Sequence, residues 1–147
     1  MYRMYKSWAI GIGAFIAGGA SALFGPQLLF AQTGGGLPTT KMILRTDLQN
    51  IPGQEVLVFT SDWAPGNTLP LHIHPDGHEF VFVVEGEQTF HIEGVGEKTV
   101  KAGEVLYTAP NVPHFGRNAT DKLSKTVVFR VKDKAQPVSI DVKQTGN

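Results

Sequence analysis

The sequence predicts an all-β domain, either a sandwich or a barrel, and three observations carry this prediction. After residue 40, short apolar or alternating runs recur, and no stretch shows convincing helical periodicity. Turn segments such as PGN, PDG, GVGE and PNVP separate the runs. Gly, Pro, Asn and Asp favour turns because they tolerate or impose the backbone angles that turns need. Many short, closely spaced strands of this kind are typical of sandwiches and barrels.

Ten runs are candidates for strands. Each places β-branched, aromatic or alternating apolar residues between turn signals. In chain order they are 41–48, 55–61, 69–74, 79–85, 88–93, 98–101, 104–108, 113–117, 125–131 and 138–142.

The run FVFVV at residues 80–84 is apolar at every position. A strand with one face in water alternates apolar and polar residues, so both faces of this strand should be covered. Either a second sheet layer or another subunit must cover the outer face. Because the domain is small, we expect a homodimer.

The composition fits one globular domain and excludes several functions. The chain has 147 residues, of which 41% are hydrophobic, and its 13 basic and 13 acidic side chains cancel. Without a basic excess it lacks the electrostatic footprint of a nucleic-acid binder, so we expect no nucleic-acid partner. The chain has no cysteine, which excludes disulfides, cysteine zinc sites and thiol nucleophiles. Any metal must therefore be held by histidine and carboxylate.

Residues 1–31 have the layout of a secretory signal. MYRMYKSW carries two basic residues and no acid, and the uncharged stretch AIGIGAFIAGGASALFG follows. A positive start, an apolar stretch and a small residue for cleavage, here Ala31, make up a signal peptide. We expect export to the periplasm or the cell exterior, with an uncleaved membrane anchor as the alternative. Residues 32–40 are predicted to be a flexible leader, and residues 41–147 a single domain.

The segment LHIHPDGHEF at residues 71–80 holds three of the five histidines in the chain and a glutamate. His72 and His74 are two positions apart, and side chains at i and i+2 of a strand point to the same face. A PDG turn follows and Glu79 begins the next strand, so a hairpin can bring its carboxylate beside both imidazoles. Two imidazoles and a carboxylate suit a divalent transition metal and leave coordination positions open for chemistry.

The segment GNTLPLHIHPDGHEFVFVVEG resembles the first motif of the cupin family, and GEVLYTAPNVPHFGRN resembles the second. The positions that carry the resemblance are Gly66, His72, His74, Glu79 and Gly86 in the first segment, and Gly103, His114 and Asn118 in the second. Ala109 and Asn111 depart from the proline and glycine that are usual in the second motif. Asn tolerates left-handed backbone, so we expect the turn at Asn111 to be kept.

The resemblance implies a small single-domain cupin with a double-stranded β-helix, or jelly-roll, barrel. In this family the two histidines and the glutamate of the first motif and the histidine of the second bind one metal ion. Carried over, the ligands are His72, His74, Glu79 and His114. Small cupins of this kind include dioxygenases similar to quercetinases, in which Glu79 would also act as a base for the substrate hydroxyl.

The other prominent residues have structural interpretations. His78 is expected to face solvent, and His91 to lie at an exposed strand position. Arg117 is expected in a surface salt bridge, with a contact to an anionic substrate as the alternative. Turn roles are expected for Gly66, Gly86, Gly103 and Asn118. Core positions are expected for Trp63, Phe80, Phe82, Phe90, Tyr107 and Phe115.

The sequence therefore predicts an exported, metal-dependent oxidoreductase, dioxygenase-like, that acts on a small oxygenated organic molecule. The alternatives are an exported ligand- or metal-binding cupin without turnover, and a metal-dependent isomerase or decarboxylase. One divalent transition metal is expected. Because an exported protein acquires its metal outside the cytosol, zinc, copper or nickel is favoured by intrinsic affinity, with iron or manganese as the alternatives.

Overall fold

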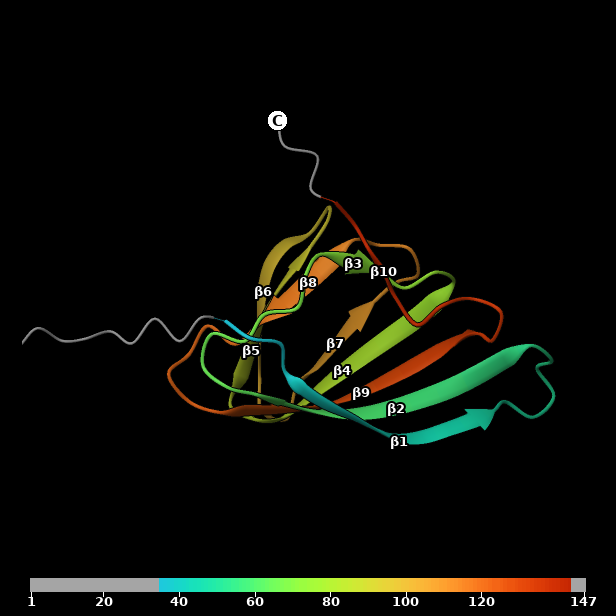
Figure 1. The fold of residues 1–147 in the computed structure, drawn as a ribbon, viewed down its shortest axis with the longest axis horizontal. Helices are drawn as coiled ribbons and strands as arrows, with labels where there is room; N and C mark the ends of the chain where they lie inside the picture. The colour runs from blue at the N-terminus through green and yellow to red at the C-terminus, as the bar shows by residue number, and fades with distance from the viewer. Residues whose placement is uncertain (1–34, 144–147) are drawn as a thin grey trace, which may run out of the picture. The chain divides into compact units, whose positions relative to one another are not determined.

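The computed structural model describes residues 35–143, so the expected signal segment at residues 1–31 lies outside this range. Ten strands form two five-stranded sheets that face each other (Figure 1). Every pairing between the strands is antiparallel. Residues 35–143 contain no helix, and accordingly no helix that could span a membrane. The all-β prediction is confirmed.

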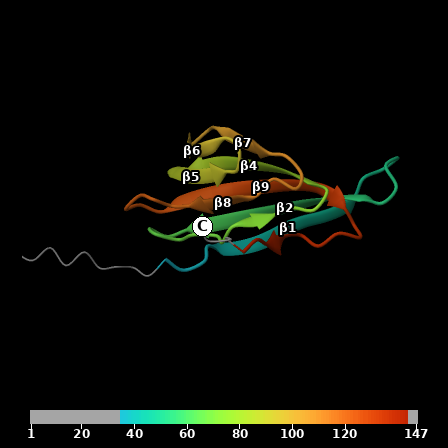
Figure 2. The same ribbon diagram turned by 90° about the horizontal axis from the view of Figure 1, so that it is seen from above.

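Sheet A and sheet B are each built from strands that are distant in the sequence. In spatial order, sheet A contains β1 (Thr39–Asp47), β2 (Gln54–Trp63), β9 (Ser124–Asp133), β4 (Gly77–Glu85) and β7 (Val105–Thr108). Sheet B contains β10 (Ile140–Asp141), β3 (His72–Ile73), β8 (His114–Arg117), β5 (Glu87–Ile92) and β6 (Gly96–Lys101). Figure 2 shows the strands of sheet A side by side in this order.

All ten predicted runs contain a strand, but two of the strands are much shorter than predicted. Run 69–74 forms a ladder only at His72–Ile73, and run 138–142 only at Ile140–Asp141. Pro70 and Pro75 bracket β3, and proline cannot donate a ladder hydrogen bond. The chain around β3 therefore leaves the sheet quickly on both sides.

The core lies between the two sheets. Inward positions on β4 alternate with outward ones, because successive side chains of a strand point to opposite faces. Val81 and Val83 on β4 pack in one buried cluster with apolar residues of four further strands. The other members are Phe90, Ile92, Val100, Leu106 and Val128.

Much of the outer face of sheet A is exposed, although Val58, which faces outward from β2, is buried. On β4, Phe80 is 38% exposed and Val84 is 50% exposed, while Val81 and Val83 are buried. Sheet B therefore covers only the inner face of the FVFVV run. The prediction of core positions is right for Trp63 and Phe90, which are buried, and wrong for Phe80 and Tyr107. Phe80 alternates with Glu79 and Val81, so it must point away from the side on which the core forms.

The turns take the backbone geometry that the motifs predict. Gly86 has a φ of +75°, and a Cβ there would lie 2.9 Å from the Leu123 carbonyl oxygen. Asn111 has a φ of +63°, so it takes the left-handed conformation expected where the motif usually has glycine.

Candidate metal centre

Three histidines converge on one point of sheet B. His72 on β3 and His114 on β8 are directly opposite each other in the ladder, and their ring centroids are 4.4 Å apart. His74 follows β3, with its ring centroid 4.8 Å from that of His72. All three side chains are buried, and their ligand nitrogens lie within 4.8 Å of one another. Strand pairing thus joins the two motifs, although about 40 residues separate them in the chain.

A backbone carbonyl orients each imidazole. The Nδ1 atoms of His72, His74 and His114 lie 2.7, 2.8 and 2.8 Å from the carbonyl oxygens of Pro70, Val138 and Val112. A carbonyl oxygen can only accept a hydrogen bond, so each neutral ring carries its proton on Nδ1. Each Nε2 atom then keeps a lone pair directed at the centre of the cluster.

Glu79 reaches this cluster from the opposite sheet. It lies on β4, is 5% exposed, and its Oε2 atom is 3.1 Å from Nε2 of His114. Its Oε1 atom is 3.2 Å from Nε2 of His74, yet that nitrogen is buried and makes no hydrogen bond. Lone pairs brought together in a buried site need a proton or a cation between them. The donor set, three imidazoles and a carboxylate, therefore fits a divalent transition metal.

Arg130 is a site residue that the sequence reasoning missed. It lies on β9 directly opposite Glu79 in the ladder, and its Nε and Nη2 atoms donate to Oε1 of Glu79 at 3.1 and 2.8 Å. Its guanidinium also lies over the Phe59 ring, 5.5 Å from the centroid. One signal could have found it. Arg130 has the same strand phase as Thr126 and Val128, so it is a charged residue at an inward position of a strand.

The charges of the site reinforce the metal fit. Burial by itself raises the pKa of Glu79, but the contacts with His114 and His74 and the charge of Arg130 outweigh it and hold the pKa well below its ordinary value. Burial lowers the pKa of His72 to about 4, and the neighbouring imidazoles act in the same direction. At neutral pH the carboxylate is therefore charged and the His72 ring is neutral, which are the protonation states that bind metal.

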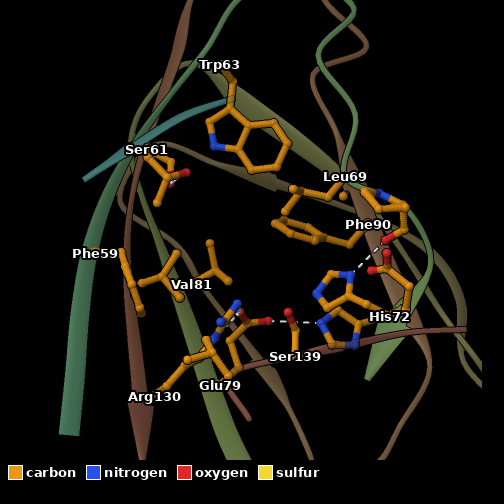
Figure 3. Close-up of a pocket in the computed structure, with 17 residues that line it drawn as sticks. Phe59, Ser61, Trp63, Leu69, His72, Glu79, Val81, Phe90, Arg130 and Ser139 are labelled. Atoms are coloured by element: carbon orange, nitrogen blue, oxygen red, sulfur yellow. Dashed lines mark hydrogen bonds and ion pairs between the residues drawn. The ribbon is translucent and has the colours of Figure 1, made fainter. Parts of the chain in front are cut away.

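A cavity of about 290 Å³ opens beside the cluster. His72, His114, Glu79 and Arg130 line one part of it. Trp63 lies at the end opposite Glu79 and Arg130 (Figure 3). The walls between are mainly apolar and include Phe59, Leu69, Val81, Phe90 and Val128. A mainly apolar cavity with a few converging polar groups is typical of small-molecule sites.

The last described residues close one side of this cavity. We call residues 138–142 the closing segment. Val138, Ser139 and Asp141 line the cavity, and the Val138 carbonyl bonds to His74. β10 pairs with β3, and the Val142 amide donates to the Leu71 carbonyl at 2.9 Å. The closing segment therefore supports the histidine cluster directly.

The two remaining described histidines lie outside the site, as predicted. His78 is exposed, and its Nδ1 atom is 2.8 Å from the Tyr107 hydroxyl. His91 is half-buried on the outer face of sheet B, where its ring stacks on Phe115 with the centroids 5.3 Å apart. Neither one lines the cavity.

Arg117 and Asn118 also take the expected structural roles. Arg117 forms a salt bridge of 2.8 Å with Glu97 and does not line the cavity. Asn118 is fully buried, and its side-chain amide donates to the carbonyls of Trp63 and Lys122 at 2.9 and 2.7 Å. It ties the end of β2 to the loop after β8, which is a structural role.

Sequence comparison places this site in a known family. Residues 59–129 match the family model described as the cupin domain. The chain is 34% identical over 88 residues to germin-like protein 1-1 of Oryza sativa subsp. japonica, a match that covers 55% of this chain and 41% of that protein. It is 32% identical over 84 residues to the rhicadhesin receptor of Pisum sativum, covering 52% and 39%. The matches thus span less than half the length of these relatives.

Solved structures share the fold. DMSP lyase DddQ from Ruegeria pomeroyi DSS-3 superposes with a TM-score of 0.61 at 17% identity, covering 76% of this chain and 54% of that one. An oxalate oxidase in complex with the substrate analogue glycolate gives a TM-score of 0.54 at 25% identity, covering 70% and 55%. A protein from Klebsiella pneumoniae described by its double-stranded β-helix domain gives 0.56 at 24%, covering 68% and 81%.

The family match includes all four residues of the candidate site, since His72, His74, Glu79 and His114 fall within residues 59–129. The two-sheet barrel agrees with the double-stranded β-helix of the neighbours. The chain therefore belongs to the cupin superfamily.

Proposed function

We propose that this protein is a metal-dependent enzyme that oxidises a small oxygenated organic molecule, in the manner of a dioxygenase. One observation carries the proposal. Three buried imidazoles cluster with a buried carboxylate beside a cavity that has room for a small ligand, and Nε2 of His74 has no hydrogen-bond partner. A purely structural metal site would be closed by its ligands and would need no cavity.

His72, His74, His114 and Glu79 would hold the ion. When bound, a divalent transition metal polarises a substrate oxygen, and a redox-active one also supports chemistry with O₂. Glu79 is ionised at neutral pH and can accept a proton from a substrate hydroxyl. Arg130 balances the charge of this carboxylate before the proton moves. The apolar walls orient the substrate and exclude water from the reacting atoms.

The shape of the cavity favours a substrate with an oxygen-bearing end and an apolar body. Arg130 and Glu79 mark the polar end, and the Trp63 indole lies at the other end (Figure 3). Oxalate has no apolar part that could contact Trp63 and Phe90. Flavonols, catechols and β-diketones have both parts. The neighbouring oxalate oxidase supports oxidative chemistry on this fold, but its substrate is a poor match for these walls.

Two measurements test the proposal. Wild-type protein is expected to bind one metal ion per chain and the His72→Ala variant far less, as measured by elemental analysis after metal loading. Oxygen consumption is then followed with protein loaded with copper, nickel, iron, manganese or zinc against the three substrate groups. Uptake with at least one redox-active metal is expected. No uptake with any combination would contradict the enzymatic proposal and leave a binding protein.

A binding protein without turnover is the second candidate, and Arg130 is the observation that favours it. The bond from Arg130 to Oε1 holds Glu79 as a fixed counter-ion, and the described part of the cavity contains no second acid–base pair. A protein that only binds should retain a ligand from the panel, measured by calorimetry, without consuming oxygen.

Export and the choice of metal remain parts of the proposal that rest on the sequence. The charged start and apolar stretch of residues 1–31 support secretion. The mass of protein recovered from the exported fraction should correspond to cleavage near Ala31. Elemental analysis of the same material should find zinc, copper or nickel. Full occupancy by iron or manganese would contradict this part.

A further inference from the structure

One inward position of β2 is polar although its neighbours on the same face are aromatic. Phe59, Ser61 and Trp63 are two residues apart along β2, so all three side chains point into the barrel. Each of them lines the cavity, and Ser61 is only 5% exposed. A buried hydroxyl in an apolar wall is costly unless it forms hydrogen bonds.

The partner of Ser61 is Thr40 on the edge strand β1. The two residues are directly opposite each other in the ladder, and their Oγ and Oγ1 atoms are 2.9 Å apart. Thr40 also lines the cavity. We call Ser61 and Thr40 the hydroxyl pair.

The hydroxyl pair is only partly satisfied by its own hydrogen bond. A hydroxyl has one proton to donate and two lone pairs with which to accept. The bond between Ser61 and Thr40 uses one of the two protons, and neither hydroxyl forms another hydrogen bond within residues 35–143. The pair therefore keeps one unused donor and several acceptor positions beside the cavity.

The neighbouring indole does not compete for this role. The N–H group of Trp63 donates to the Thr126 hydroxyl at 3.1 Å, and Thr126 does not line the cavity. Trp63 therefore presents an apolar ring to the cavity. Figure 3 shows Ser61 and Trp63 at the end opposite Glu79 and Arg130. The hydroxyl pair supplies polar groups at this end.

The strand register gives the distance between the two polar ends of the cavity. Glu79 and Arg130 share a row with Leu57 on β2, and Ser61 is four residues further along that strand. At about 3.3 Å per residue, the two rows lie roughly 13 Å apart. A hydrogen bond of about 3 Å at each end leaves roughly 7 Å between two ligand oxygens. The row between the ends is apolar and consists of Phe59, Val128 and Val81.

The charges of the cavity favour an uncharged oxygen at the far end. Arg130 is the single arginine or lysine among the described lining residues, and its Nε and Nη2 atoms both donate to Glu79. Asp141 adds a second acid to the lining. A carboxylate bound beside Ser61 would lose its hydration without gaining a cationic partner. A hydroxyl or carbonyl oxygen can be satisfied by the hydroxyl pair alone.

We propose that the hydroxyl pair is a second subsite of the cavity, which selects ligands with an uncharged oxygen at the end remote from the metal centre. Since the pair belongs to the same cavity, this role rests on the proposed function of that cavity. The apolar body of the ligand would lie between the two ends, against Phe59 and Val81. Catechol has its two oxygens on neighbouring ring atoms and can reach only one end. A flavonol with a hydroxyl at the 4′ position of its outer ring can reach both.

Three flavonol probes test the subsite in full-length protein loaded with zinc. Zinc has no redox chemistry, so binding can be measured by calorimetry without turnover. The probes are 3-hydroxyflavone and its 4′-hydroxy and 4′-carboxy derivatives, which share the same metal-binding end. The 4′-hydroxy probe should bind wild-type protein about fivefold more tightly than the parent compound, as expected for one added hydrogen bond. The 4′-carboxy probe should bind more weakly than the parent.

Variants of the hydroxyl pair should remove this preference. In Ser61→Ala, the ratio of affinities for the 4′-hydroxy probe and the parent should fall from about five to about one. Thr40→Val keeps the shape of the side chain and should lower the ratio in the same direction. Because Thr40 is exposed on an edge strand, this variant should fold even if Ser61→Ala does not. Thr46→Val is the matched control, since Thr46 is exposed on the same strand and does not line the cavity.

The ratio of affinities separates selection from a structural role, because a general loss of stability affects both probes alike. Circular dichroism shows whether each variant is folded. Three outcomes would overturn the proposal. They are equal affinities of wild-type protein for the parent and the 4′-hydroxy probe, an unchanged ratio in the folded variants of the pair, and failure of all three probes to bind. Tight binding of the 4′-carboxy probe would overturn the preference for an uncharged oxygen. Selective binding without oxygen consumption would contradict the enzymatic function and leave the subsite in place.

Discussion

Each histidine of the cluster has its proton placed by the backbone. For His72 and His114 the accepting carbonyl lies two residues earlier in the chain, while for His74 it comes from Val138. The local backbone thus orients the rings of His72 and His114, and a contact with a segment distant in the sequence orients the ring of His74. This orientation leaves Nε2 of each ring available as a ligand, while burial keeps the His72 ring neutral.

The neutral ring of His72 predicts how stability depends on pH in the metal-free protein. The folded protein takes up this proton near pH 4, whereas the unfolded chain takes it up near pH 6.5. Between these values the unfolded state binds more protons, so the free energy of unfolding falls as the pH is lowered from 6.5 to 4. The shift corresponds to about 3 kcal/mol. Glu79 causes a further loss of unfolding free energy at lower pH. Its pKa is lower in the folded state than in the unfolded chain, so the ionised carboxylate stabilises the fold above the ordinary carboxyl pKa. This contribution disappears as the pH falls through the pKa of the folded state.

Urea unfolding of metal-free protein at pH 7, 5.5 and 4 measures this effect. His72→Asn should lose less stability than wild type over the same interval, by up to about 3 kcal/mol. His78→Asn removes an exposed histidine from the same segment and serves as the control. Parallel curves for wild type and His72→Asn would contradict the assignment of a neutral ring.

Arg130 predicts a second effect at the residue scale. Its replacement by methionine leaves the Glu79 carboxylate buried without its partner, so metal-free Arg130→Met should lose about 3 kcal/mol of unfolding free energy. Saturation with zinc should reduce this loss, because the ion then compensates the carboxylate. Arg117→Met is the matched control. Arg117 is exposed in its pair with Glu97 and should cost less than about 1 kcal/mol. An equal loss of unfolding free energy in both arginine variants, measured by urea unfolding, would show that the buried pair with Glu79 stabilises the fold no more than an exposed pair does.

These residues also show where sequence reasoning reaches and where it ends. His72, His74 and Glu79 could be predicted because a strand and a tight turn fix their directions within eight positions. Arg130 is 51 residues from Glu79, and only the register between β4 and β9 makes them neighbours. No local pattern encodes that register. The prediction that Phe80 is a core residue was wrong for a related reason. Its aromatic character suggested burial, but its position in the strand alternation turns the ring outward.

Among the elements, the closing segment supports the histidine cluster although its strand, β10, has only two residues. The alternation of residues and the turn signals predicted the long strands well, because each one has an apolar face of its own. β3 and β10 have little apolar face and exist through their mutual pairing. The short ladders of these two strands could not be predicted from the residue pattern. They nevertheless hold two histidines in place, because His72 lies in β3 itself and His74 bonds to the Val138 carbonyl just before β10.

The closing segment should therefore contribute to metal affinity. A chain that ends after Gln136 lacks the Val138 carbonyl and the ladder beside His72, and its zinc affinity should fall about 10- to 100-fold. A chain that ends after Lys143 keeps both and should bind as the full chain does. Competition with a chelator measures the affinities, and circular dichroism shows whether the barrel persists. Equal affinities in the two truncated chains would mean that His74 needs no support from this segment.

At the scale of the whole molecule, the candidate metal centre joins the two sheets. Sheet B supplies the three histidines, and sheet A supplies Glu79 and Arg130. A bound ion would tie the two sheets together beside the cavity, which both sheets line.

This arrangement predicts that metal stabilises the whole domain. An ion that binds only the folded state adds about 2.7 kcal/mol at a free concentration of 100 times its dissociation constant. For a domain of roughly a hundred residues, this raises the melting temperature by roughly 10 °C. Differential scanning calorimetry at fixed chain concentration should show this rise on zinc addition and its reversal by a chelator. His114→Ala removes the histidine that faces both His72 and Glu79, so its melting temperature should hardly respond to zinc. A full response in that variant would mean that the ion binds elsewhere, and that the two sheets are held together without it.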